Sequence, residues 1–111
     1  MSLLSRKEEL ILLAVWKLQD GEGAYGVPIR RYIEKMTGVT WLFGAIYGPL
    51  ARLVEKDLVE AYESDPLPER GGRRKILYRL TEDGKAALQE AREINASIWE
   101  DVSPLVRNRR S

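Results

Sequence analysis

Basic residues gather in two short runs, which are the part of this sequence best suited to bind a charged partner. One run lies within Arg70–Lys75, around the Gly71-Gly72 pair, and the other lies within Arg107–Arg110. These ten positions carry seven basic and no acidic residues, whereas the other 101 carry 11 basic and 17 acidic residues, or −6. Basic runs on an otherwise acidic chain are typical of a local contact with a polyanion. The alternative is that each run only solubilises a loop or a tail.

The first run has the composition of a contact to a nucleic-acid backbone. Gly71 and Gly72 allow the main chain to approach a phosphate closely, and Arg73, Arg74 and Lys75 follow at once. Each phosphate that such residues neutralise lowers log K by about 0.9 for every tenfold rise in salt. We therefore expect these three cations to bind DNA phosphates.

Enzyme chemistry has little support in the composition. The chain has no histidine and no cysteine, which excludes imidazole and thiol catalysis, disulfides and nearly every zinc, copper or haem site. The acidic pairs Glu8-Glu9, Glu82-Asp83 and Glu100-Asp101 are expected to be solvated helix-face residues. We predict that the protein is not an enzyme and binds no metal or cofactor.

The length and the apolar pattern indicate one globular domain away from membranes. A chain of 111 residues, 44% hydrophobic and 32% charged, is an ordinary single domain. Its longest apolar run, Leu10–Trp16, has seven residues, against about 20 needed to cross a bilayer. The charged start, Met1–Glu9, does not resemble a secretory signal. These features predict a cytoplasmic protein.

The first half of the chain predicts three short amphipathic helices. A capping box at Ser5–Glu8 starts the first, which ends before Gly21. The second follows Gly26 and ends at Gly38, and the third extends over Phe43–Lys56. The residues expected in the core recur at helical spacing: Leu10, Ile11, Ala14, Val15 and Leu18, then Ile29, Ile33 and Met36, then Ile46, Leu50, Leu53 and Val54.

The period then changes from helical to alternating. Leu58–Glu63 and Lys75–Leu80 alternate as strands do, with Ile76, Tyr78 and Leu80 on one face. The intervening Ser64–Arg74 contains two prolines and the glycine pair, which predicts a long hairpin loop. A fourth helix is expected to follow.

That fourth helix is expected to start at Thr81, whose hydroxyl can cap it. Pro104 cannot lie in a helix interior, so the helix is predicted to end near Ser103. Its apolar or small residues recur at heptad-like spacing, which indicates a homodimer. Asn95 would fix the register of the dimer by pairing with Asn95 of the second copy. The alternative to a dimer is that the fourth helix folds back on its own domain. The residues expected at the dimer interface are Leu88, Ala91, Asn95, Ile98, Trp99 and Val102, with Leu105 if the helix continues.

This order of elements predicts a mainly α fold with a small β-hairpin, a winged helix-turn-helix followed by a long C-terminal dimerisation helix. We expect residues 1–80 to form the winged helix, 81–106 the dimerisation helix of the same compact unit and 107–111 a basic tail. In such folds the second helix of the helix-turn-helix enters the major groove. Winged helices also bind proteins, so a protein-interaction module without DNA binding is the alternative.

Three stretches carry a family resemblance over about residues 8–103. They are Ala24–Gly26, then Gly44–Leu53 (GAIYGPLARL) with Glu55–Val59 (EKDLV), and then Gly71–Gly84 (GGRRKILYRLTEDG). In these motifs the chain resembles the PadR family of bacterial transcriptional regulators. The resemblance implies a repressor that binds a palindromic operator as a homodimer, and the length is similar to that of the short subfamily with a single C-terminal helix.

The chain departs from the family's pattern at two positions of the recognition helix. Ala45 stands where the family usually has Ser or Thr, so a hydroxyl that could contact DNA is absent. The family's proline usually follows the tyrosine directly, whereas here Gly48 intervenes before Pro49. Pro49 leaves the Ala45 carbonyl without its helical partner unless the helix starts late or bends.

The resemblance places Tyr47 on the side that faces DNA, although it could instead support the core as a half-buried aromatic. Arg52 could reach a phosphate or pair with Glu55. Backbone amides at the start of the helix can bind phosphate. Trp41 lies there as well, and its side chain could contact DNA or fill a space in the core. The residues expected to bind DNA are Tyr25, Thr40, Gly44, Ala45, Tyr47, Arg52, Arg73, Arg74 and Lys75.

A multidrug-sensing branch of the family holds flat ligands against a tryptophan of the dimerisation helix. In this chain the corresponding Trp99 lies about one turn further along, so dimer packing is its alternative role. We expect double-stranded DNA, a second copy of the chain and a small aromatic or drug-like effector as partners, with no membrane. The residues expected to contact the effector are Trp99, Asn95 and Trp16.

Overall fold

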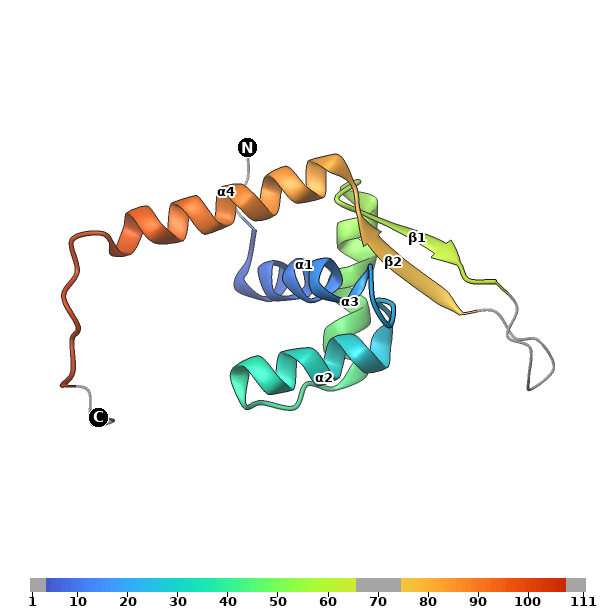
Figure 1. Ribbon diagram of the computed structural model, residues 1–111, viewed down its shortest axis with the longest axis horizontal. Coiled ribbons are helices and arrows are strands. Elements are labelled where there is room, and N and C mark those ends of the chain that lie inside the picture. The colour runs from blue at the N-terminus through green and yellow to red at the C-terminus, as the bar shows by residue number, and fades with distance from the viewer. Residues whose placement is uncertain (1–3, 66–74, 108–111) are drawn as a thin grey trace.

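Three helices, a two-stranded hairpin and a long fourth helix make up the part of the chain that the structure describes, which is residues 4–65 and 75–107 of a computed structural model (Figure 1). The strands pair antiparallel, with Val59 opposite Leu80 and Glu63 opposite Ile76. This order confirms the predicted winged helix. The elements are α1 (Arg6–Leu18), α2 (Gly26–Thr37), α3 (Phe43–Glu55), β1 (Val59–Glu63), β2 (Ile76–Leu80) and α4 (Glu82–Trp99).

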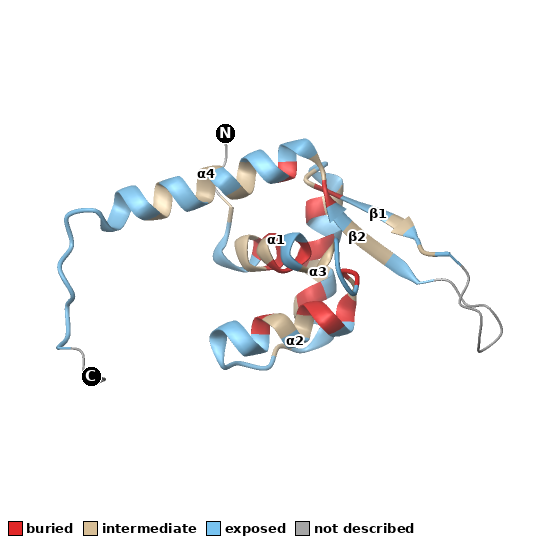
Figure 2. Cartoon of the chain, viewed as in Figure 1, coloured by how far each residue is buried: buried red, intermediate tan, exposed pale blue. Residues whose placement is uncertain are grey.

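The core forms where the first three helices meet, with α1 at its centre. Because α1 contacts α2, α3, α4 and β2, Leu12 is fully buried although it lies outside the predicted stripe. Met36 was wrongly placed in the core: it is 53% exposed, since the last turn of α2 and the residues up to 40 all face solvent. Figure 2 shows that burial is concentrated in α1–α3 and at the base of the hairpin. The other predicted core residues are buried, except that Leu10, Leu18 and Val54 are half-buried.

Burial along the hairpin decreases toward its tip. Leu80 is buried, Tyr78 is half-buried and Ile76 is exposed, although alternation places all three on the predicted face. The backbone N–H of Tyr78 donates to the carbonyl of Ala24, at 2.9 Å. This bond ties β2 to the turn between α1 and α2, so the base of the hairpin is held firmly against the helices.

The third helix passes through Pro49 without interruption. It starts at Phe43, as predicted, and Pro49 lies buried in its interior. At its end the N–H of Leu58 donates to the Leu53 carbonyl and that of Asp57 donates to the Val54 carbonyl, each at 3.0 Å. These two bonds form a Schellman motif. The motif requires a left-handed residue, which here is Asp57, with φ of 60°.

The fourth helix starts on a tight contact with the end of the third. The Thr81 hydroxyl accepts from the N–H of Gly84 at 3.0 Å and donates to the Asp57 carbonyl at 2.6 Å. A Cβ on Gly84 would overlap the Leu58 carbonyl oxygen and lie 2.9 Å from its carbon. Only glycine therefore allows α4 to approach this closely.

The fourth helix ends at Trp99, four residues before the predicted end at Ser103. Glu100 and Asp101 would bring negative charge to the negative end of the helix dipole, and Pro104 disfavours helical geometry at Ser103. Val102 and Leu105 therefore lie beyond the helix and are exposed. The outer half of α4 extends past α1 (Figure 1). Within the described residues, no helix is long and apolar enough to cross a membrane.

Glu8 is a buried structural residue and not the solvated one that we expected. Only 5% of it is exposed, because α1 turns this side chain toward the end of α3. Its carboxylate accepts from the Lys56 ammonium at 2.7 Å and from the Ser5 N–H at 2.9 Å. Burial by itself raises the pKa of Glu8, but the hydrogen bonds from Lys56 and Ser5 outweigh it, and the pKa lies below its usual value of 4.5.

Candidate nucleic-acid interface

The start of α3 carries four of the predicted DNA-binding residues, with Thr40 just before the helix and Gly44, Ala45 and Tyr47 in its first two turns. Tyr47 is 47% exposed on the second turn of α3. Gly44 is exposed with open space around it, and Ala45 is half-buried. The Thr40 side chain is exposed before the helix, where its hydroxyl donates to the Glu34 carboxylate.

Lys75 and Tyr25 join the hairpin to the start of α2. The Lys75 ammonium donates to the Tyr25 hydroxyl at 3.1 Å and lies 4.2 Å from the centre of its ring. Tyr25 is half-buried and precedes the first residue of α2, whereas Lys75 is exposed. A cation–π contact of this kind orders the lysine while its charge stays available to solvent.

Tyr47 rests its hydroxyl against the first residue of α2. A Cβ on Gly26 would overlap that hydroxyl and lie 2.7 Å from the ring carbon that bears it. Tyr47 is therefore both half-exposed and packed, so it holds α3 against α2 and presents one side of its ring to solvent.

A second tyrosine lies beside this contact. Burial raises the pKa of Tyr78 above its usual value of 10.0, and the neighbouring Tyr47 phenol raises that pKa further. Tyr78 therefore stays neutral at physiological pH and adds no negative charge to the surface.

Arg52 has no ion-pair partner among the described residues, so the alternative pairing with Glu55 does not occur there. Its side chain is exposed and one guanidinium nitrogen lies close to Gly48, one turn earlier. Trp41 is half-buried and packs against the core. Arg52 is thus the freer of these two side chains to reach a partner.

Several predicted basic residues lie outside the described residues. Arg73 and Arg74 belong to that part of the chain, as do Arg70, Arg109 and Arg110. Lys75 and Arg107 are described and exposed.

Sequence reasoning missed an apolar part of this surface. Leu42 is 78% exposed at the cap of α3 and Phe43 is 38% exposed. The Arg30 guanidinium lies 4.5 Å from the centre of the Phe43 ring, and the Phe43 and Tyr47 rings are 6.3 Å apart. The spacing of four between Phe43 and Tyr47 could have paired them on one helix face. The contact with Arg30 depends on how α2 crosses α3.

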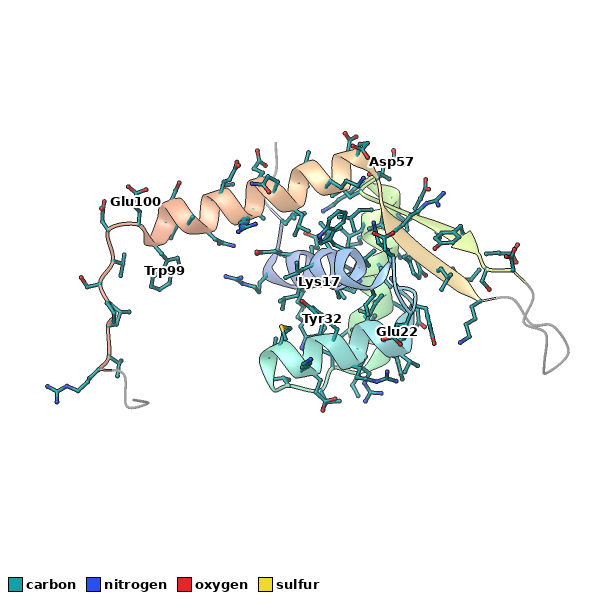
Figure 3. The ribbon with its side chains drawn as sticks, in the orientation of Figure 1. Lys17, Glu22, Tyr32, Asp57, Trp99 and Glu100 are labelled. Carbon is teal, nitrogen blue, oxygen red and sulfur yellow. The ribbon has the colours of Figure 1, made fainter. Side chains whose placement is uncertain are left out.

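Most of α4, as far as Asn95, lies on its own domain. Leu88 packs against the core, and the Asn95 amide donates to the Glu9 carboxylate at 2.9 Å. Ala91 is half-buried, whereas Ile98 and Trp99 are exposed. Figure 3 shows Trp99 at the far end of α4, away from Asp57 at its start. The predicted dimer residues thus divide into an inner group that packs internally and an outer group that faces solvent.

Two open grooves flank α4. One, of about 930 Å³, is lined by Trp16 and Asn95 among others. The other, of about 580 Å³, is lined by Ala91, Asn95 and Ile98 among others. Trp99 lines neither groove, so the chain brings together two of the three predicted effector residues. The described residues contain no cluster of His, Cys, Asp and Glu side chains that could hold a metal ion.

Comparison with known proteins agrees with this geometry. The chain matches the family model described as "Transcriptional regulator PadR-like family" over residues 12–90. It is similar to a PadR family transcription regulator from Clostridium difficile, with 25% identity, a TM-score of 0.66 and coverage of 89% of this chain and 100% of that one. A PadR-like transcription factor from Bacteroides fragilis matches with 27% identity, a TM-score of 0.69 and coverage of 87% and 89%. RosR of H. salinarum matches with 28% identity, a TM-score of 0.67 and coverage of 90% and 81%. No curated protein matches the chain.

Proposed function

Since the chain belongs to the PadR-like family of transcriptional regulators, which bind DNA and are not enzymes, we propose that it is a homodimeric repressor of a palindromic operator. The observation that carries this proposal is the exposed start of α3, with Arg52 exposed further along the helix and Lys75 held against Tyr25, next to the Gly26 that Tyr47 contacts. A helix placed in this way can enter the major groove while the cations contact the phosphate walls.

The proposed DNA contacts divide by role. Gly44, Ala45 and Tyr47 would face the base edges, and Thr40 and Tyr25 would lie toward the backbone. Lys75 and Arg52 would bind phosphates, together with Arg73 and Arg74 of the hairpin loop. Contacts to phosphate position the protein without reading sequence, so we expect these four cations to account for most of the salt dependence.

The proposed dimer uses the last turn of α4. Ile98 and Trp99 are large apolar residues that are 61% and 56% exposed there, and a second copy of the same helix would cover them. A two-fold dimer would place its recognition helices about 34 Å apart, in successive major grooves.

The proposed effector site is the groove between α1 and α4. Trp16 is exposed there, with the Lys85 ammonium 5.9 Å from its ring, and a planar aromatic ligand could stack on it. In the dimer we expect Trp99, at the end of α4, to contact the same ligand. The ligand can change the spacing of the two heads only by as much as its affinities for the two spacings differ.

The test is a binding titration by fluorescence anisotropy across a salt series. The full chain is titrated into a labelled duplex from the region upstream of its own gene and into a scrambled duplex. We expect tight, sequence-selective and salt-steep binding with two chains per duplex. Arg52→Ala should weaken binding to both duplexes and reduce the salt slope by about one. Arg92→Ala, which removes an exposed arginine from α4, is the matched control and should bind normally.

An absence of binding at low salt would overturn the proposal and favour the protein-interaction module. Equal binding to both duplexes with a normal salt slope would retain DNA binding but remove the proposed sequence specificity.

A further inference from the structure

The exposed start of α3 is almost entirely apolar. Leu42 caps the helix with 78% of its surface exposed, and Phe43, Gly44 and Ala45 follow. No carboxamide, guanidinium or carboxylate occurs between Leu42 and Gly48. A surface that read bases through hydrogen bonds would need such groups in these two turns.

Few polar groups lie nearby. The Thr40 hydroxyl already donates to Glu34, and the Tyr47 hydroxyl is packed against Gly26. Arg52 lies nine residues after Phe43, and one of its guanidinium nitrogens lies close to Gly48, which is in the middle of the helix. We therefore expect the first two turns of α3 to make few hydrogen bonds to bases.

Two cations lie near this end of the helix. The Arg30 guanidinium lies 4.5 Å from the Phe43 ring centre, and the Lys75 ammonium lies 4.2 Å from that of Tyr25, the residue before the Gly26 that Tyr47 contacts. Cations beside an apolar strip suit a duplex, because its phosphates line the walls of the groove in which its apolar groups lie.

The apolar group that a base pair offers in the major groove is the C5-methyl of thymine. Alanine and phenylalanine side chains are among those that contact it, and a leucine can do the same through dispersion and burial. Ala45 offers only a methyl at the position where a hydroxyl would have allowed a hydrogen bond.

We propose that Leu42 and Phe43, supported by Ala45, are specificity-determining residues that read thymine methyl groups in the operator. Arg30 positions the Phe43 ring through its cation–π contact and does not itself read bases. This inference rests on the proposed DNA binding and names the chemical group that is recognised.

The test removes the methyl groups and nothing else. A high-affinity duplex is first selected from a random library with the purified full chain. Each thymine in it is then replaced by deoxyuridine, which keeps the base pair and every hydrogen-bonding group. Burial of one methyl group corresponds to about a fourfold change in Kd, so we expect about fourfold weaker binding at each contacted thymine and little change elsewhere.

The variants then assign the methyl contacts to residues. Leu42→Ala and Phe43→Ala should bring the ratio of the deoxyuridine and thymine Kd values close to one at the positions that each side chain reads. Met36→Ala, which truncates an exposed apolar residue on the last turn of α2, is the matched control and should leave all ratios unchanged. Because Leu42 is exposed, its variant should unfold at the same denaturant concentration as the parent chain.

Each contrary result has a distinct meaning. The inference is overturned if binding is tight and selective but its Kd does not change when methyl groups are removed. It is also overturned if the selected duplex contains no thymine. Both results leave the proposed function intact. Methyl discrimination that persists in both variants overturns the assignment to Leu42 and Phe43. A failure to select any duplex overturns the proposed function and the inference together.

Discussion

The Lys56 ammonium lies 2.7 Å from the carboxylate of Glu8, so the end of the recognition helix is tied to the first turn of α1. Glu8 also completes the capping box with Ser5. A single buried carboxylate thus starts one helix and anchors another, which keeps α3 at a fixed angle to the rest of the domain.

Glu8→Gln should lower the free energy of unfolding by about 1 kcal/mol at neutral pH, because glutamine keeps the capping box but loses the ion pair. Lys56→Gln should cost more, since it leaves a buried carboxylate without its partner. Denaturant unfolding of both single variants and the double variant measures the coupling. Equal effects that simply add would show that the ion pair contributes nothing.

Stability should fall in acid because of the same residue. The pKa of Glu8 is lowered in the folded chain, so the unfolded chain binds more protons in this range. The stabilisation is complete above the unfolded value near 4.5 and is lost as the pH falls through the lower folded value. The loss should be smaller in Glu8→Gln. Unfolding curves of the two chains, recorded from neutral pH down through the usual glutamate value of 4.5, measure the difference.

Gly26→Ala should destabilise the domain by about 1–3 kcal/mol, because its Cβ would occupy the space of the Tyr47 phenol. In a Tyr47→Ala background that space is empty, so the same change should cost much less. A double-mutant cycle in denaturant measures this coupling. The result would contradict the packing if Gly26→Ala cost the same in both backgrounds.

Gly84→Ala should cost about 3 kcal/mol, since its Cβ would meet the backbone of Leu58, which cannot move aside. Gly44→Ala is the matched control: it lies in a helix with open space around it, and should stabilise the chain by about 0.5–1 kcal/mol. Thermal unfolding of the two variants should therefore shift in opposite directions.

Asp57→Gly should stabilise the chain by about 0.5–1 kcal/mol, because Asp57 adopts the left-handed conformation that glycine accepts without strain. Its carbonyl, which accepts from Thr81, is kept. Urea unfolding should show a higher midpoint with an unchanged slope. A lower midpoint would mean that the Asp57 side chain itself stabilises the turn.

Ile98→Ala with Trp99→Ala should weaken the proposed dimer at least tenfold, because the two side chains are the large apolar residues that the last turn of α4 exposes. Sedimentation equilibrium measures the dissociation constant, and Met36→Ala, at an exposed apolar residue of α2, provides the control. Unchanged self-association would place the dimer interface elsewhere.

Features that depend on a few neighbouring residues could be predicted from the sequence. The capping box at Ser5, the end of α2 before Gly38 and the start of α3 at Phe43 are confirmed. Each is controlled by hydrogen bonds or backbone preferences within one turn. The order of helical and alternating periods along the chain likewise predicted the winged helix.

Features that depend on how the elements pack were decided only by the tertiary structure. Glu8 is buried because the end of α3 crosses α1, and Asn95 reaches Glu9 because α4 lies back on the domain. Leu42 and Phe43 remain exposed although both are apolar, and the Phe43 ring meets Arg30 of α2 rather than the core. Residues far apart in sequence meet in each of these cases. Periodicity describes one helix at a time, and so it gives the apolar positions but not the neighbour that covers or uncovers them.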